Sequence, residues 1–291
     1  MPQLIGLPEP PPPGAAALPA GTFDGTTVFV TGAGTGLGKA IATEFARLGA
    51  AIVIASRAQE HLDAGRDAIA ALGAPVHTVV CDIRDADQVH AAFDEAASAF
   101  ALPDVLVNNA AANFPVAADE MSPNAWRTVV DITLNGTFFC AREFARRHLD
   151  AGTPGSIVNV GASYAWTGGP GFAHSAAAKA GVKNMVETLA VEWGPYGIQV
   201  NGLVPGLFPH EDMTADIQGN LERTSDKDVC QPALRVGRLR ELGWAATFLA
   251  SPYGRFISGH TLVVDGANWQ RRSLTNPPVQ TVRAQMGREE S

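Results

Sequence analysis

The stretch Thr31-Gly32-Ala33-Gly34-Thr35-Gly36-Leu37-Gly38-Lys39 follows the β-branched run TTVFVT (26–31) and opens a helix-like segment. Its spacing is T-G-x-x-x-G-x-G and does not fit G-x-G-x-x-G. Glycines let a turn adopt positive φ and let a pyrophosphate approach the backbone N–H groups at a helix N-terminus. The position between a first strand and a first helix therefore predicts a dinucleotide-binding turn, with a merely tight turn as the alternative.

Outward from this turn, short apolar runs alternate with helix-like segments. The predicted strands are 26–31, 51–55, 76–80, 104–108, 156–160, 198–203 and 261–265. The predicted helices are 36–48, 59–72, 85–100, 123–149, 173–193 and 241–250. Buried strands joined by helical crossovers predict an α/β fold: a single Rossmann-type domain with a doubly wound, parallel, seven-stranded sheet and helices on both faces.

Composition narrows the class of protein. The chain has 291 residues, of which 46% are hydrophobic and 17% charged, and its net charge is −8. No cluster of Lys and Arg interrupts this acidity, so we expect no nucleic acid or anionic membrane as main partner. No apolar run approaches the roughly 18 residues of a membrane span. Three distant cysteines and no clustered ligands predict a cytoplasmic protein with reduced thiols and no bound metal.

The two ends differ from the predicted domain, 21–269. Residues 1–20 hold seven of the 20 prolines, which predicts an extended lead-in, because proline fixes φ and lacks a backbone N–H. Residues 270–291 are polar and are expected to form a tail.

The end of the second predicted strand favours one dinucleotide. A carboxylate there would bind a free ribose 2′-hydroxyl and repel a 2′-phosphate. The chain instead reads Ser56-Arg57, and a hydroxyl beside a guanidinium suits a phosphate. We therefore expect NADP(H), with a solvated arginine as the alternative. The cofactor-binding residues expected from these turns and strand ends are Thr31, Gly32, Gly34, Thr35, Gly36, Leu37, Gly38, Ser56, Arg57, Asp82, Ile83, Asn109 and Ala110.

These motifs, together with Asn108-Asn109-Ala110, Leu134-Asn135-Gly136 and Pro205-Gly206, resemble the short-chain dehydrogenase/reductase superfamily over roughly 24–268. The usual signature there is Tyr-x-x-x-Lys with an earlier serine. Lys179 fits, but Ser175 occupies the tyrosine position and Ala162 the serine position. Tyr164 follows the fifth predicted strand and is the candidate replacement for the missing phenol.

This displacement resembles the NADPH-dependent 2,4-dienoyl-CoA reductases, as do the stretches 108–114, 122–126, 164–182 and 192–197. The resemblance implies that Tyr164 and Asn113 bind the thioester oxygen and that Lys179 holds the nicotinamide ribose. It also adds Lys179, Pro205 and Gly206 to the residues expected to bind the cofactor. It further implies a homotetramer and an acyl-CoA substrate. The catalytic set expected is Tyr164, Lys179, Asn113, Asn135 and Ser175, and the substrate-binding set is Arg84, Phe114 and Ser122. In contrast to that group, the segment 207–220 has no cation that could contact CoA.

The chemistry agrees with this resemblance. Hydride addition to a conjugated dienoyl thioester produces a dienolate, which needs positioned hydrogen-bond donors more than an immediate proton. Reduction of the dienoyl thioester to a 3-enoyl-CoA is therefore the favoured reaction. The alternatives are a trans-2-enoyl-CoA reductase, another short-chain oxidoreductase and a non-catalytic NADP-binding protein. Asn135 has a second interpretation as well, since Asn-Gly inside a long helix indicates a kink.

Overall fold

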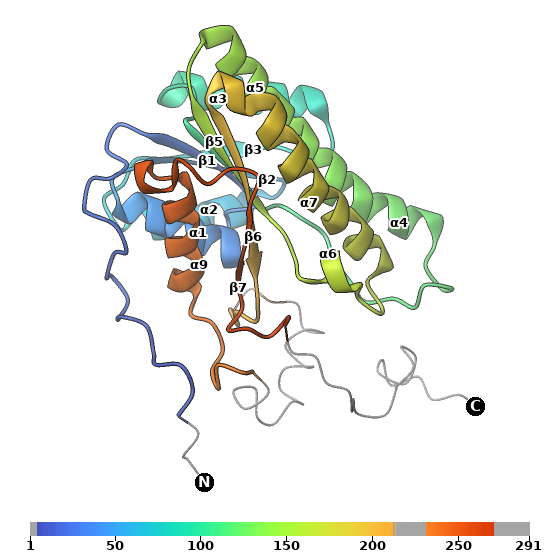
Figure 1. Cartoon of the computed structure of the whole chain (residues 1–291). Coiled ribbons are helices and arrows are strands. Elements are labelled where there is room, and N and C mark those ends of the chain that lie inside the picture. Colours follow the sequence, from blue (N-terminus) through green and yellow to red (C-terminus); the bar gives the residue numbers. More distant parts are fainter. Residues whose placement is uncertain (1–4, 212, 214–230, 271–291) are drawn as a thin grey trace.

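The computed structural model describes residues 5–211, 213 and 231–270, and its centre is a parallel sheet (Figure 1). Seven strands pair in the order β3-β2-β1-β4-β5-β6-β7, and every pairing is parallel. Their bounds are β1 (Thr27–Thr31), β2 (Ala51–Ser56), β3 (Val76–Val80), β4 (Val105–Asn108), β5 (Gly155–Val160), β6 (Ile198–Pro205) and β7 (Thr261–Val264). The predicted seven-stranded, doubly wound sheet is confirmed.

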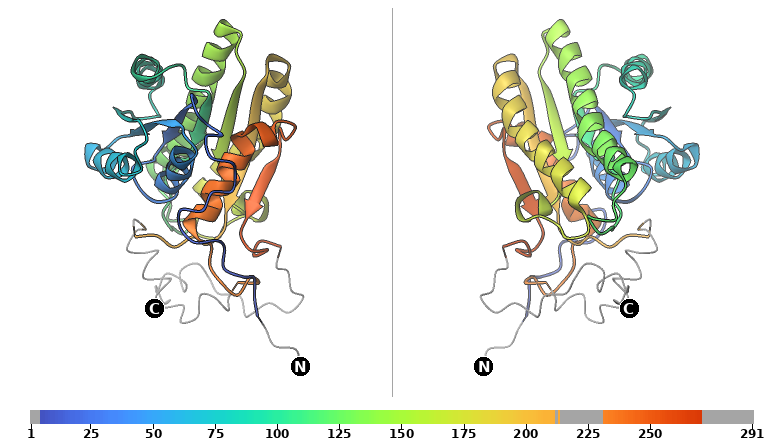
Figure 2. Two further views of the ribbon diagram at one scale, coloured as in Figure 1. Left: turned by 90° about the vertical axis from the view of Figure 1, so that its left-hand side faces the viewer. Right: turned by 90° about the vertical axis from the view of Figure 1, so that its right-hand side faces the viewer.

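Helices cover both faces of the sheet, as Figure 2 shows from two sides. One face carries α1 (Gly36–Arg47), α2 (Gln59–Ala70) and α9 (Leu239–Ala250); the other carries α3 (Ala86–Ala99), α5 (Gly136–Ala151) and α7 (Ala173–Trp193). Each layer buries its own apolar cluster against alternate residues of the strands, since successive strand side chains point to opposite faces. On β1, for example, Val28 and Val30 pack beneath α1, whereas Phe29 stacks on Phe93 of α3.

The strand order reverses beside β1, which pairs with β2 on one side and β4 on the other. Ligands of such sheets bind beyond the carboxyl ends of the strands at this reversal point. The Thr31 hydroxyl joins the two loops there, because it accepts hydrogen bonds from the backbone N–H groups of Asn109 and Ala110, both at 3.0 Å.

The helix expected over 123–149 consists of three parts: α4 (Pro123–Val130), a π-helical turn η1 (Asp131–Asn135) and α5. Ser122 caps α4 by accepting a hydrogen bond from the Ala125 N–H at 3.1 Å. In the π turn the Asn135 side-chain amide donates to the Asp131 carboxylate at 2.9 Å. A π turn is a single wide turn that often marks functional sites, and here it lies at the Asn-Gly step that the sequence indicated as a kink.

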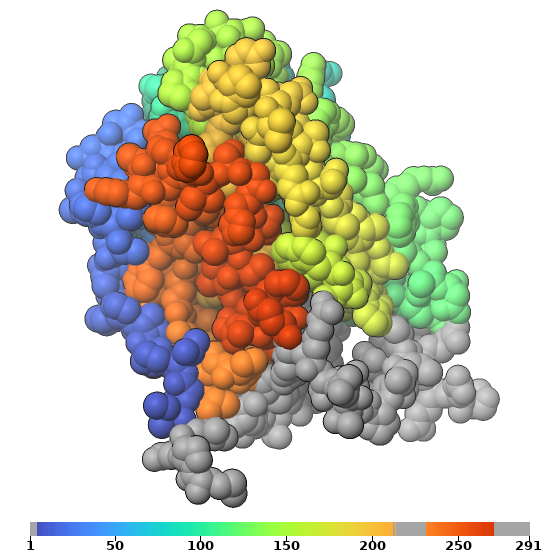
Figure 3. Space-filling view, in the orientation of Figure 1, coloured from blue at the N-terminus to red at the C-terminus, as the bar shows by residue number. Residues whose placement is uncertain are grey.

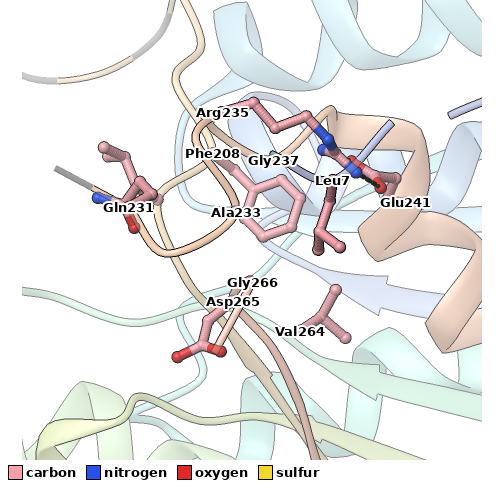
Figure 4. A pocket seen from close by; sticks show the side chains of 11 residues that line it. Leu7, Phe208, Gln231, Ala233, Arg235, Gly237, Glu241, Val264, Asp265 and Gly266 are labelled. Carbon is pink, nitrogen blue, oxygen red and sulfur yellow. Dashed lines mark hydrogen bonds and ion pairs between the residues drawn. The ribbon is translucent and has the colours of Figure 1, made fainter. Parts of the chain in front are cut away.

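The proline-rich residues 5–18, which we call the N-terminal strap, contain no helix or strand but pack alongside α9 and the segment before it. The main-chain carbonyls of the strap accept hydrogen bonds from Arg235, Arg240 and Trp244. Figure 4 shows the amino-terminal end of this contact, where Leu7 and Phe208 line a cavity of about 120 Å³ beside the Arg235–Glu241 ion pair. The proline-rich lead-in is therefore packed against the domain.

Other sequence-based expectations concern the ends and surface of the chain. The predicted tail from 271 onward, most of 212–230 and Cys230 lie outside the described residues. Within the part that the structure describes, no helix is long and apolar enough to cross a membrane. In that same part, His, Cys, Asp and Glu nowhere gather into a group of three suited to a metal. Cys81 and Cys140 are buried free thiols.

Candidate active site

The glycine turn after β1 has positions that cannot accommodate a side chain. Gly32 and Gly36 adopt φ of +66° and +54°, which L-residues rarely adopt. A Cβ on Gly38 would overlap the Asn109 side-chain amide and the Gly32 carbonyl oxygen. The turn therefore presents backbone at the N-terminus of α1, as binding of a pyrophosphate requires.

Beside this turn lies a cavity of about 300 Å³ at the reversal point of the sheet. Most of the predicted cofactor residues line it, namely Gly32, Gly34, Thr35, Gly36, Leu37, Ser56, Arg57, Asp82, Ile83, Asn109 and Ala110. The cavity is an open cradle of glycine backbone with cationic and hydroxyl groups at one end. The residues present therefore fit a dinucleotide.

Charged side chains gather at the end of this cavity where Arg57 and Asp82 lie. The Arg84 guanidinium donates to both carboxylate oxygens of Asp82, and this pairing holds the pKa of Asp82 below its usual range. Arg57 adds a further positive charge near the same carboxylate. Because Arg84 neutralises Asp82, the carboxylate repels an incoming phosphate less strongly. The structure thus places Arg84, which was expected to contact substrate, on the carboxylate of the cofactor cavity.

The candidate catalytic phenol lies where three residues meet. Tyr164 belongs to the short helix α6 (Tyr164–Thr167), which follows β5. Its hydroxyl is 3.0 Å from the Ser175 Oγ, and the Asn113 side-chain amide donates to it at 3.4 Å. Burial raises the pKa of the Tyr164 phenol, so the hydroxyl keeps its proton at neutral pH. The structure thus brings together Tyr164, Asn113 and Ser175, which lie far apart in the sequence.

Lys179 lies one turn further along α7 and is almost completely buried. Its ammonium donates to the main-chain carbonyl of Val160, the last residue of β5. Burial lowers the pKa of Lys179 to about 8. The lysine is thus held at the end of β5, near the loops that line the cofactor cavity.

The remaining predicted residues have other contacts. Asn135 bonds Asp131 within the π turn, which packs on α7 through Leu134 and Gly181. The Ser122 hydroxyl caps α4. Phe114 lies edge-on to the buried ring of His174, with 4.7 Å between the ring centroids. Pro205 ends β6, and Gly206 donates its N–H to the Val264 carbonyl at 2.9 Å.

Six residues that line the cofactor cavity are not among the predicted cofactor-binding residues, namely Ala55, His61, Cys81, Ala111, Ile132 and His210. The ring of His210 lies against Gly36, where an added Cβ would be 2.9 Å from it. At the catalytic end, Phe172 stacks on Tyr164 with the rings nearly parallel and 6.3 Å between their centroids. No motif in the sequence marks His61 or Phe172.

Comparison with known proteins identifies the family of this chain. A family model for enoyl-(acyl carrier protein) reductase matches residues 32–267. A probable 2,4-dienoyl-CoA reductase [(2E)-enoyl-CoA-producing] of Bacillus subtilis is 37% identical over 83% of this chain and 96% of its own. A probable 2,4-dienoyl-CoA reductase [(3E)-enoyl-CoA-producing] of Caenorhabditis elegans is 39% identical over 84% of this chain and 81% of its own.

Solved structures share the fold. A short chain dehydrogenase from Bacillus anthracis is 38% identical, with a TM-score of 0.77, over 84% of this chain and 96% of that one. A candidate 2-deoxy-D-gluconate 3-dehydrogenase from Agrobacterium tumefaciens with bound NADP is 33% identical, with a TM-score of 0.78, over 85% of this chain and 98% of that one.

The chain therefore belongs to the short-chain dehydrogenase/reductase family and is an oxidoreductase. Within that family it is 2,4-dienoyl-CoA reductase-like, as the displaced tyrosine also indicated.

Proposed function

We propose that this chain reduces a 2,4-dienoyl-CoA thioester at a carbon–carbon double bond, with NADPH as reductant and a 3-enoyl-CoA as product. One observation carries the proposal: the Tyr164 hydroxyl lies between the Asn113 amide and the Ser175 hydroxyl, although Ser175 fills the place of the usual tyrosine. The names of the relatives support the substrate class.

The proposed role of the phenol and the amide is to stabilise negative charge. When bound, NADPH supplies the hydride, and the electrons displaced from the diene collect on the thioester oxygen. Tyr164 and Asn113 both carry N–H or O–H donors that can point at one such oxygen. A positioned donor of this kind is typically worth about 3–4 kcal/mol of the barrier.

Lys179 would hold the ribose hydroxyls of the cofactor. Its ammonium is already fixed by the Val160 carbonyl, which leaves two of its three N–H groups for other acceptors. The positive charge favours both an anionic cofactor and an anionic dienolate nearby.

We propose NADPH rather than NADH because Ser56 and Arg57 line one end of the cofactor cavity and Arg84 neutralises Asp82 there. Arg57→Ala should raise the Kd for NADPH at least tenfold and leave the Kd for NADH nearly unchanged. Fluorescence titration with both cofactors tests this. An equal loss for the two cofactors would contradict the assignment of Arg57 to the 2′-phosphate.

The product depends on which carbon of the dienolate receives the proton. Protonation at the α-carbon gives a 3-enoyl thioester, and protonation at the γ-carbon gives a 2-enoyl thioester. The two relatives above are named for different products. We propose the 3-enoyl product because Tyr164 and Asn113 hold the charge at the thioester end, where solvent can protonate the α-carbon.

The decisive experiment follows NADPH oxidation at fixed enzyme with dienoyl-CoA, trans-2-enoyl-CoA and 3-ketoacyl-CoA in parallel. We expect turnover with the dienoyl thioester to exceed the other two at least tenfold, and NMR of the product to show a double bond at C3. Preference for the 2-enoyl substrate would establish the alternative reductase. Tight NADPH binding without turnover of any thioester would indicate a non-catalytic NADP-binding protein.

We also propose that the enzyme works as a cytoplasmic homotetramer. Apolar side chains near the edge strand β7, Val191 and Phe256, are 81% and 105% exposed, and Gly259 joins their two segments by packing on Ala190. Sedimentation should give a mass near four chains, and Phe256→Glu should shift it to smaller species. A monomer at micromolar concentration would contradict the tetramer.

A further inference from the structure

The helix that carries the candidate catalytic phenol is too short to hold its own position. Helix α6 has four residues, has no side-chain cap, and contains no fully buried residue. Isolated helical turns of this length are unstable in water. The position of the Tyr164 hydroxyl must therefore be fixed by contacts that α6 makes with other segments.

On its inner side, α6 is supported by the stacking of Tyr164 on Phe172. On the other side the support comes from the segment after β7. Trp166 stacks on Trp269 with 5.3 Å between ring centroids and 21° between ring planes, and the Lys183 ammonium lies 5.9 Å from the centroid of the Trp166 ring. At the surface, the red segment ending at residue 270 lies against the yellow-green segment that includes α6 (Figure 3).

The turn that presents Trp269 is specifically built. Gly266 and Ala267 both have positive φ, and for a non-glycine residue such as Ala267 this conformation costs roughly 1–2 kcal/mol. The Asp265 carboxylate accepts a hydrogen bond from the Trp269 N–H at 2.8 Å and so closes the turn. Strained backbone that persists in a fold often marks a functional position.

The same turn also contacts the predicted cofactor side of the site. A Cβ on Gly206 would lie 2.5 Å from the Cβ of Asp265, so Gly206 and this turn are in close contact. The turn 265–269 thus connects the Pro205-Gly206 segment to the helix that carries Tyr164.

We propose that Trp269 is a positioning residue: by stacking on Trp166 it fixes helix α6 and thereby holds the Tyr164 hydroxyl at the meeting point with Asn113 and Ser175. The effect on turnover rests on the proposed function, whereas the effect on α6 does not. Trp269 has no direct role in the chemistry, so it acts on the rate and on the backbone of α6 without changing cofactor affinity.

The test compares Trp269→Ala, Trp269→Phe and the control Tyr196→Ala. Tyr196 is an aromatic residue 62% exposed at the amino end of β6, which is the end of the sheet opposite the site. Trp269→Ala should lower kcat with the dienoyl thioester by about 10- to 100-fold, because small misplacements of a catalytic group cost this much. The Kd for NADPH should change less than twofold. Trp269→Phe should restore most of the rate, and Tyr196→Ala should match the unmodified enzyme.

Hydrogen–deuterium exchange gives a readout that needs no substrate. Trp269→Ala should increase exchange of the backbone N–H groups of Trp166 and Gly168, which are bonded to Ser163 and Tyr164, while β1 and β5 remain protected. If the unmodified enzyme reduces no thioester but this exchange still rises, the proposed function fails and the positioning role stands. Unchanged exchange and unchanged kcat in Trp269→Ala would overturn the positioning role.

Discussion

At the scale of single residues, the site differs from the usual family signature in where its hydroxyl groups come from. Ser175 stands four residues before Lys179, and the phenol comes from Tyr164, eleven residues earlier in the chain; the two oxygens are 3.0 Å apart. The site therefore keeps an O–H group near the place where the family signature has one. Because burial raises the pKa of the phenol, Tyr164 is suited to donate a hydrogen bond to an oxyanion rather than to release its proton.

The first residue-scale prediction separates the two hydroxyls. Tyr164→Phe should lower kcat by roughly 100-fold or more, because it removes the proposed donor to the developing oxyanion together with the contacts of that hydroxyl with Ser175 and Asn113. Ser175→Ala should lower kcat less, because the Asn113 amide and the phenol remain. Steady-state kinetics with the dienoyl thioester, with NADPH affinity measured alongside, tests both. A larger loss for Ser175→Ala would assign the principal donor to the serine.

The second residue-scale prediction is that the protonation of Lys179 controls how kcat/KM for NADPH depends on pH. Since its pKa is lowered to about 8, the lysine is charged below that pH and neutral above it. If the charged form binds NADPH, kcat/KM for NADPH should be level below pH 8 and fall about tenfold for each further pH unit.

Lys179→Met should be poorly active and should lose that pH dependence.

The same variant also tests how the buried lysine affects the stability of the folded protein. Burial depresses the pKa of the folded state below that of the unfolded chain, so wild-type stability should rise between about pH 8 and the unfolded pKa near 10.4. The melting temperature of Lys179→Met should therefore exceed that of the wild type at pH 7, with the difference shrinking toward pH 10. A difference independent of pH would contradict a buried, titrating lysine.

At the scale of elements, the strand–turn–helix unit at β1 and α1 leaves no room for side chains at specific points. Gly38→Ala should raise the Kd for NADPH at least tenfold, because the new methyl group would overlap the Asn109 amide and the Gly32 carbonyl and push the turn open. Gly194→Ala is a matched control, since Gly194 has φ of −53° and no atom lies within 4 Å of an added Cβ. Isothermal titration on both variants tests the prediction, and equal affinities would refute it.

Strands and helices could be predicted from the sequence where a local pattern of residues determines them. Continuous β-branched runs gave all seven strands, and the helix over 173–193 agrees with α7 at both ends. The π turn was indicated only as a kink at Asn135-Gly136, because the register of its backbone bonds depends on packing against α7. Helix α6 was missed, since a four-residue helix stabilised by Trp269 has no periodicity of its own.

The site followed the same rule. Asn113, Tyr164 and Ser175 could be grouped from a family resemblance, and the structure places them in contact. His61 was not predicted, because its place depends on how helix α2 lies over the glycine turn. Arg84 could be assigned to substrate by motif alone, whereas its contact with Asp82 depends on the path of the loop after β3.

At the scale of the whole molecule, the N-terminal strap joins residues that are more than 220 positions apart. The Leu7 N–H donates to the Ala233 carbonyl at 2.8 Å, and Glu9 pairs with Arg238 at 2.6 Å. The partners of the strap in these bonds lie near the other end of the sequence. The proline content of the strap therefore could not predict these bonds. The strap covers the start of α9. Helix α9 packs against α1 on the face of the sheet that also carries α2.

Removal of residues 1–17 tests whether the strap is part of the folded domain. Trp244 donates its indole N–H both to the Ala15 carbonyl at 3.1 Å and to the buried Glu44 carboxylate at 3.0 Å. Truncation deletes the first bond and frees Arg235 and Arg240 from strap carbonyls, and net hydrogen bonds of this kind contribute about 0.5–1.5 kcal/mol each. We therefore expect the free energy of unfolding in urea to fall by about 1–3 kcal/mol.

The kcat of the truncated protein should stay within twofold, because no strap residue contacts Tyr164 or Lys179 in the described structure. Ile5→Ala, at a side chain 84% exposed, should leave stability unchanged. An unaltered urea midpoint after truncation would show that the strap contacts have no net energetic effect.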